Sequence, residues 1–419
     1  MFVIAISIFS LLLSTAVLLL GIGLQGSLLG LRAGVEEYSI ATTGIVMSSY
    51  FIGFAIGSIY NPRVIRNYGH IRSYAAMATL ASAAAIAYPL NTDPWFWTLL
   101  RIITGISVVG MNMIIESWLN SLASNTMRGK FFGVYMIITL LSMAIGQHLL
   151  RLGEVASYEL FAMTTILISL ALIPVVLTRI PQPEISDPKQ LKLRRLFSLS
   201  PLGVVGTLSA GMITGSFWGM GAVYAALIGL DETGIAWLMS LIIVGGATLQ
   251  WPLGRLSDTI DRRTVIQFSA FAGATLAIIN SMISINSSWL FYLTSFLFGG
   301  FVFIFYGLSA AHVNDRIDAD HSLEAAQGLL QVYGIGAILG PLLTALALNH
   351  FGPQGMLYLF AIIMFALGMF TIHRMHQSSA PPPEEQTEFI LLNRTSPVAL
   401  EMSGLDEHAD HDNEKAPEE

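Results

Sequence analysis

Twelve long apolar stretches follow one another along this chain of 419 residues, and they limit its possible folds more than any other feature. Each comes close to the roughly 20 apolar residues that an α-helix needs to cross a bilayer. The stretches occupy residues 4–29, 42–60, 73–90, 95–119, 131–150, 158–178, 202–228, 236–254, 264–284, 289–311, 325–348 and 353–373. Ordinary soluble domains are about 25% charged, whereas this chain is 11% charged and 54% hydrophobic. The sequence therefore predicts an all-α membrane protein with twelve transmembrane helices.

The first apolar stretch is expected to stay on the protein as a membrane span. Residues 1–31 contain no charged side chain, so the positive region that opens a signal peptide is missing. The apolar run is also longer than the roughly 7–15 residues of a signal-peptide core. The chain contains no cysteine, which excludes disulfides, iron–sulfur clusters and thiolate zinc sites.

Basic residues in the short connections predict the direction in which the chain crosses the membrane, because Lys and Arg are enriched on the cytoplasmic side. Fourteen of them lie in connections on one side, and only Arg32 and Arg151 lie on the other. The fourteen are Arg63, Arg66, Arg72, Arg128, Lys130, Arg179, Lys189, Lys192, Arg194, Arg195, Arg255, Arg262, Arg263 and Arg316. We therefore expect a multi-pass protein with both termini in the cytoplasm.

Two polar segments interrupt and end the apolar pattern. Residues 179–201 contain four prolines and a basic cluster, which favours a solvated cytoplasmic linker, with binding to anionic lipid head groups as the alternative. From Arg374 onward eleven acidic residues outnumber three basic ones, so the net charge of −7 arises in the tail. We expect residues 374–419 to form a disordered acidic cytoplasmic tail. Nothing in the charge distribution suggests a nucleic-acid partner.

The two halves of the chain echo each other at an offset of 194 to 197 residues. The matching positions are Gly57 with Gly254, Asn61 with Asp258, and Gly146 with Gly340. Small residues let helix backbones approach closely, so each pair is expected to mark the same contact in its own half. The repeat predicts two pseudo-symmetric six-helix bundles, residues 1–178 and 202–373, of the kind that transporters rock around a central site.

Several motifs resemble those of the major facilitator superfamily over residues 1 to about 373. The strongest is GRLSDTIDRR, which runs from Gly254 to Arg263 and follows the loop signature G-x-x-x-D-[RK]-x-G-R-[RK] of the family, with Thr259 and Asp261 as departures. The first-half copy is degraded, since Asn61 stands where the family has Asp. Four further segments are similar to a poorly characterised bacterial branch, the YcaD-like facilitators. They are residues 48–53, 116–119, 128–130 and 146–147.

The resemblance implies the major facilitator fold in a monomeric secondary active transporter of the bacterial inner membrane. It would move a small metabolite or drug-like solute by alternating access, among membrane lipids and with no cofactor. The chain contains no G-x-x-x-x-G-K-[ST] phosphate loop, so a gradient must drive active transport. Efflux with one proton site fits best, because few charges lie within the spans. A lipid-moving facilitator or a non-transporting receptor with the same fold remains the alternative.

An enzyme is not expected, because no histidines at metal-ligand spacing accompany the carboxylates Asp315, Asp318 and Asp320. Arg101, in a segment RIITG that resembles the helix-four motif R-x-x-x-G of the family, is the clearest functional candidate. It lies about 9 Å into its helix, counted from Trp95 at about 1.5 Å per residue. A charge in a span is costly, so Arg101 should face a polar interior, where it would contact substrate or a proton-coupling group. Snorkelling to the outer interface is the alternative.

Glu116 lies about 22 Å further along the same helix, near its cytoplasmic end. That depth favours a cytoplasmic gate, in which Glu116 pairs with Arg63 or Arg66. The repeat then predicts that Asp315 pairs with Arg262 or Arg263. Asp258, after Gly254, would accept hydrogen bonds at the N-terminus of the helix that starts near residue 131. Glu116 has two alternative interpretations. It could be an interfacial side chain without a special role, or a titrating coupling group.

Uncharged polar residues at mid-membrane depth complete the set of substrate or coupling candidates. Gln25, Asn112 and Gln331 are the ones that we select. For any one of them a hydrogen bond between helices is the simpler interpretation. Aromatic residues on the seventh and tenth spans, Trp218 and Phe303 among them, could line an apolar cavity or pack against lipid.

Overall fold

The computed structural model describes residues 2–122, 125–178, 183, 193–283, 288–317, 322–377 and 389. Most of the expected linker and of the acidic tail lies outside these ranges, so their expected disorder and solvation stay predictions. Within the described residues every regular element is a helix. Eleven helices are long and apolar enough to cross a membrane, or twelve if a bent pair counts as one span. The predicted all-α membrane fold is confirmed.

The helices follow the twelve expected stretches in order. The first group is α1 (Phe2–Val35), α2 (Ile40–Tyr68), α3 (His70–Ala87), α4 (Pro94–Leu122), α5 (Asn125–His148), α6 (Glu159–Leu170) and α7 (Leu172–Leu177). The second group is α8 (Leu193–Leu199), α9 (Pro201–Leu227), α10 (Glu232–Thr259), α11 (Arg262–Met282), α12 (Ser288–Asn314), α13 (Ser322–Phe351) and α14 (Gly355–Gln377). The sixth expected span comprises α6 and α7, and the short α8 meets α9 at an angle of 116°.

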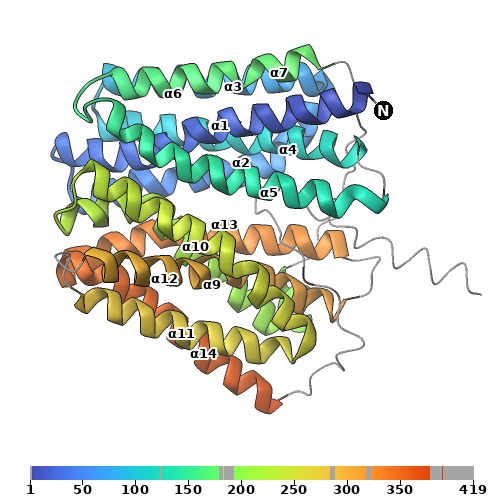
Figure 1. Ribbon diagram of the computed structural model, residues 1–419, viewed down its shortest axis with the longest axis vertical. Helices are drawn as coiled ribbons and strands as arrows, with labels where there is room; N and C mark the ends of the chain where they lie inside the picture. The colour runs from blue at the N-terminus through green and yellow to red at the C-terminus, as the bar shows by residue number, and fades with distance from the viewer. Residues whose placement is uncertain are drawn as a thin grey trace, which may run out of the picture.

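The two groups of helices lie on opposite sides of the molecule, α1–α7 on one and α9–α14 on the other (Figure 1). Equivalent helices pack in equivalent ways, since α2 packs on α4 as α10 packs on α12. A Cβ at Gly146 would lie 2.6 Å from the carbonyl oxygen of Leu20, and one at Gly340 would lie 2.3 Å from that of Met212. Any larger residue would push α5 off α1 or α13 off α9. The two glycines therefore mark the same contact in each half, as the repeat predicts.

Several helices run past the ends that the apolar pattern predicts. α2 continues to Tyr68, so Arg63 and Arg66 lie on the helix, whereas the sequence places them in a loop after residue 60. The helix ends only at Gly69, which has a φ of 82° and donates its N–H to the carbonyl oxygen of Ile65 at 2.8 Å. An apolar stretch marks the part of a helix that meets lipid, whereas backbone hydrogen bonding continues into the interfacial layer until a residue such as glycine stops it.

The two groups touch at the end of the molecule that carries Arg32 and Arg151. There the Ser48 hydroxyl donates to the carbonyl oxygen of Ile338 at 2.6 Å, and the Ser240 hydroxyl donates to that of Ala144 at 2.8 Å. Helices α5 and α10 diverge toward the opposite end, where the N-terminus lies (Figure 1). The end with few basic residues is therefore closed.

Candidate functional site

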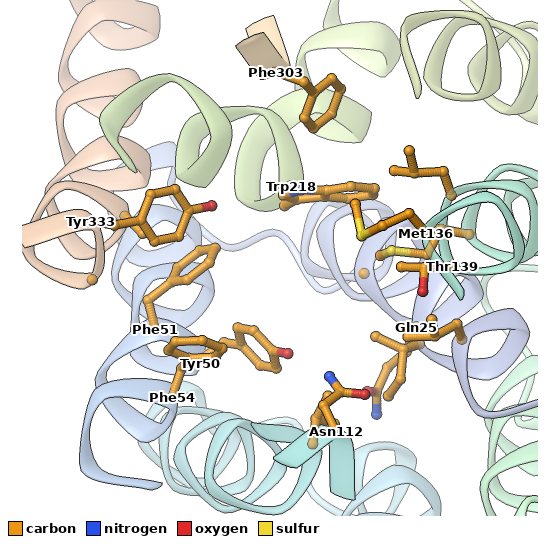
Figure 2. Close-up of a pocket in the computed structure, with 18 of the residues that line it drawn as sticks. Gln25, Tyr50, Phe51, Phe54, Asn112, Met136, Thr139, Trp218, Phe303 and Tyr333 are labelled. Carbon is orange, nitrogen blue, oxygen red and sulfur yellow. The ribbon is translucent and has the colours of Figure 1, made fainter. Parts of the chain in front are cut away.

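A cavity of about 170 Å³ lies between the two groups of helices. Its walls come from α1, α2, α4 and α5 on one side and from α9, α10, α12 and α13 on the other. Most lining side chains are apolar or aromatic, with a few polar groups among them (Figure 2). Three of the four predicted substrate or coupling residues line it, namely Gln25, Arg101 and Asn112.

Arg101 lines the cavity and is only 5% exposed. Its guanidinium carbon lies 4.7 Å from the centre of the Tyr50 ring, and its Nε has no hydrogen-bond partner. A Cβ at Gly105 would lie 2.1 Å from the carbonyl oxygen of Tyr50, so this glycine lets α2 approach α4 closely enough to cover the guanidinium. The side chain thus points into the protein interior and does not extend along the outer surface as the snorkelling alternative requires.

Gln25 and Asn112 bring two amides to one end of the cavity, and Trp218 and Phe303 lie toward the other end (Figure 2). The amides are 2% and 4% exposed, and Gln25 Nε2 and Asn112 Oδ1 have no hydrogen-bond partner. Buried polar atoms are rarely left without a partner, because burial without a hydrogen bond costs free energy. The two amides are therefore available to a bound molecule.

Gln331 is half-buried on α13 and is not among the residues that line the cavity. The same helix contributes Tyr333, Gly334 and Ala337. An α-helix turns by about 100° per residue, so Gln331 points about 200° away from Tyr333. The structure therefore separates Gln331 from the other three candidates.

Aromatic side chains of the N-terminal half are one part of the site that the sequence did not reveal. Tyr50, Phe51 and Phe54 line the cavity from α2, and Tyr135 lines it from α5. Tyr50 and Phe54 are four residues apart and so share one helix face. That spacing is the available signal, but it is common in helices that only face lipid.

Glu116 is fully buried, and its Oε1 accepts a hydrogen bond from the Tyr135 hydroxyl at 2.8 Å. Tyr135 in turn lines the cavity. Glu116 does not pair with Arg63 in this conformation, in which Arg63 is exposed, donates to the carbonyl oxygen of Ile59 and lies over the Tyr60 ring. The extension of α2 carries Arg63 on an exposed helix face. Pairing of Glu116 with Arg66 stays a prediction.

In the C-terminal half, Arg262 and Asp315 form the predicted ion pair. Arg262 Nε lies 2.8 Å from Asp315 Oδ2, and Nη2 lies 3.3 Å from Oδ1, with both side chains 1% exposed. Nη1 of the same guanidinium contacts Ser257 Oγ at 3.2 Å and Asp258 Oδ1 at 3.3 Å. Arg263 pairs with Asp261, whose carboxylate also accepts the Arg263 N–H at the start of α11.

Burial lowers the pKa of Arg316, and the nearby Arg263 lowers it further, whereas Asp315 raises it. These three influences on one guanidinium show how closely positive charges gather at the ends of α11 and α12. Asp315 offsets part of their mutual repulsion.

Gly254 and Asp258 meet a residue from the far end of the chain. The Phe389 N–H donates to Asp258 Oδ1 at 2.8 Å, and a Cβ at Gly254 would lie 2.1 Å from the Phe389 ring. This contact was not foreseen. The predicted contact of Asp258 with the start of α5 involves residues 125–130, whose side chains lie outside the described part of the chain, and it stays a prediction.

Comparison with known proteins identifies the relatives of this chain. The family described as "Major Facilitator Superfamily" matches residues 4–226 and 203–403. An "Uncharacterized MFS-type transporter YcaD" from Escherichia fergusonii is 26% identical over 374 residues, which cover 88% of this chain and 97% of the relative. A similar transporter from Yersinia enterocolitica, YE1530, is 24% identical over 364 residues, 86% of this chain and 94% of the relative. The predicted resemblance to the superfamily and to its YcaD-like branch is confirmed.

Solved structures show the same fold at low sequence identity. The nucleoside transporter NupG superposes with a TM-score of 0.73 at 14% identity, over 89% of this chain and all of NupG. A bacterial homolog of the human lysosomal transporter Spinster, in an inward-facing and unoccupied conformation, has a TM-score of 0.69 at 14% identity, over 96% of this chain and 98% of the homolog.

Proposed function

This chain belongs to the Major Facilitator Superfamily, and we propose that it is a secondary active transporter that moves a small solute through the described cavity by alternating access. The family consists of transporters and not of enzymes. The observation that carries the proposal is the position of the cavity, which lies between the two groups of helices and is lined by both. A solute bound there would be released on either side when the two groups rock about it.

We further propose that residues 1–178 and 202–373 are the two moving bundles and that both termini are cytoplasmic. With that orientation the contacts of Ser48 and Ser240 close the outer side, so this conformation faces inward. Cysteines at Glu154 and Ser198, two exposed positions, should react with impermeant maleimide from opposite sides of the membrane in this cysteine-free chain. Reaction from the same side would contradict the orientation.

Glu116 is our candidate for proton coupling. It is a fully buried carboxylate, and its Tyr135 partner lines the cavity, so a change in its charge would reach the solute through one side chain. A carboxylate can bind and release a proton, which a coupling group must do in each cycle.

We also retain the cytoplasmic gate as a proposal, with Gly254, Asp258, Arg262, Arg263 and Asp315 on its C-terminal side. In the closed state Asp258 would accept hydrogen bonds at the start of α5. Asp258→Asn should therefore favour the inward-facing state and raise the reactivity of cysteines at the inner ends of α4 and α12. Unchanged reactivity would show that the loop signature has no gating role here.

Uptake of an unknown solute tests the transport proposal directly. Proteoliposomes with the purified protein would be incubated with a ¹³C-labelled cell extract, with and without a pH gradient, and the retained solutes identified by mass spectrometry. We expect at least one solute to accumulate with the protein and to be lost when a protonophore collapses the gradient. Accumulation of none, with folded protein present, would favour a non-transporting receptor, and movement of labelled phospholipid would favour a lipid-moving facilitator.

A further inference from the structure

The described side chains that line the cavity carry a positive charge and no negative one. Of the described residues that line it, Arg101 alone carries a formal charge. Its guanidinium is 5% exposed, lies against the Tyr50 ring and keeps Nε without a hydrogen-bond partner. A buried charge costs several kcal/mol unless it is paired and hydrogen-bonded, as an order-of-magnitude estimate. A ligand that supplies a carboxylate would provide the missing charge and the acceptor atoms, and guanidinium binds carboxylate in a two-point geometry.

Seven of the other twenty lining residues are aromatic, and one of them, Tyr50, lies against Arg101. Trp218 and Phe303 have ring centres 6.0 Å apart, and Tyr50, Phe51 and Tyr333 project toward the same space (Figure 2). Flat rings stack with other flat rings at such separations. A wall of this kind suits a planar apolar body better than a sugar, whose hydroxyl groups would need more hydrogen-bond partners.

The volume indicates the size of the body that fits among the lining side chains. A dry cavity of about 150 Å³ accommodates one benzene molecule, and pockets for drug-sized molecules measure roughly 300–1,000 Å³. A cavity of about 170 Å³ therefore holds one ring with one or two small substituents. The free Gln25 Nε2 and Asn112 Oδ1 could bind a polar substituent away from the carboxylate.

We infer that the cavity selects small organic anions of the aromatic monocarboxylate class, with the carboxylate on Arg101 and the ring between the aromatic walls. The inference rests on the proposed transport function for its biological meaning, but it concerns binding alone. It predicts that the site disfavours cations.

Three probes that share one ring and differ in charge test the inference. Benzoate, benzamide and benzylamine are negative, neutral and positive at pH 7, and their binding to the purified full-length protein would be measured by calorimetry in detergent. We expect benzoate to bind at least tenfold more tightly than the other two. Equal binding of benzamide, tighter binding of benzylamine, or binding of none of the three would overturn the inference without any variant.

A variant then assigns the selectivity to Arg101. In Arg101→Gln, which keeps a polar side chain without charge, benzoate should lose its advantage over benzamide. Asn91→Gln, at an exposed position outside the cavity, is the matched control and should keep the advantage. If the Arg101→Gln variant still binds benzoate tenfold more tightly than benzamide, the anion must bind at another site.

The same probes separate this inference from the transport proposal. If benzoate binds selectively but radiolabelled benzoate never crosses the proteoliposome membrane, the ligand class stands and the transport function fails. If the labelled-extract experiment yields a cationic solute, transport stands and the ligand class fails.

Discussion

The second and eighth spans end in two regions that we call the N-terminal corner, around Asn61, and the C-terminal corner, around Asp258. They occupy equivalent positions in the repeat, but their polar contacts differ. In the N-terminal corner Asn61 is 2% exposed, and its Nδ2 donates to the carbonyl oxygen of Ile106 at 2.8 Å, which ties α2 to α4. In the C-terminal corner Arg262 joins Asp258 on α10 to Asp315 beyond the end of α12. The contact that Asn61 makes is a neutral hydrogen bond, whereas its counterpart Asp258 belongs to a network of charges.

The difference shows that a structural repeat can keep its packing while its polar contacts diverge. Gly146 and Gly340 still mark equivalent backbone contacts in the two halves. Backbone packing is imposed by the shared fold, whereas an ion pair survives only if both partners remain. Asn61 stands at the position that corresponds to Asp258 and carries no charge, so it cannot form an ion pair.

The largest effect is expected from Asp315→Ala in the charged corner. Removal of one partner from a buried ion pair costs about 3–5 kcal/mol, because the other charge stays buried. Thermal unfolding in detergent should show this loss. The double variant Arg262→Gln with Asp315→Asn should recover part of it, and a loss under about 1 kcal/mol in Asp315→Ala would mean that the pair contributes no more than an exposed one.

Glu116→Gln tests whether the buried carboxylate of the N-terminal half couples transport to protons. Glutamine still accepts the Tyr135 hydrogen bond but cannot ionise. We expect gradient-driven accumulation to fall at least tenfold while exchange of solute without a gradient continues. Tyr135→Phe keeps the carboxylate and removes only the hydrogen bond, so it should retain the gradient dependence. An unchanged response of Glu116→Gln to the gradient would leave Glu116 with a structural role.

A smaller effect is expected from Asn61→Ala in the neutral corner. The variant loses one hydrogen bond and leaves the Ile106 carbonyl without this donor, a cost of about 1 kcal/mol. The same unfolding measurement should therefore show a clear gap between Asn61→Ala and Asp315→Ala. Equal losses would mean that the two corners contribute alike, and the contrast between them would fail.

The smallest effect concerns Phe389, which contacts the C-terminal corner. With 4-fluorophenylalanine at position 389, Gly254→Ala should shift the ¹⁹F resonance, because the added methyl group occupies the space of the ring. Gly34→Ala is the matched control, since no atom lies within 4 Å of a Cβ there. Unfolding should change by less than about 0.5 kcal/mol. A ¹⁹F resonance that does not shift in Gly254→Ala would contradict the contact between Phe389 and Gly254.

The sequence by itself determined the order of the membrane-spanning helices, the family and one contact of the candidate site. Apolar stretches of span length reveal membrane helices because lipid accepts no other continuous backbone than a helix or a closed barrel. The ion pair of Arg262 with Asp315 was predictable because the repeat relates it to the expected pairing of Glu116 with the basic residues after the second span. The burial of Arg101 was predictable because a charge in a span must avoid lipid.

Only the tertiary structure decided which residues share the cavity. Its lining comes from eight helices, and the rotation of each helix about its axis selects the residues that point inward. That rotation includes Tyr333 and excludes Gln331, and it leaves Arg63 exposed in this conformation. Phe389 lies 131 residues beyond Asp258, and no sequence pattern connects them. Contacts between distant segments depend on how the helices pack against one another. A single sequence predicts the helices from local patterns, but it does not predict their packing.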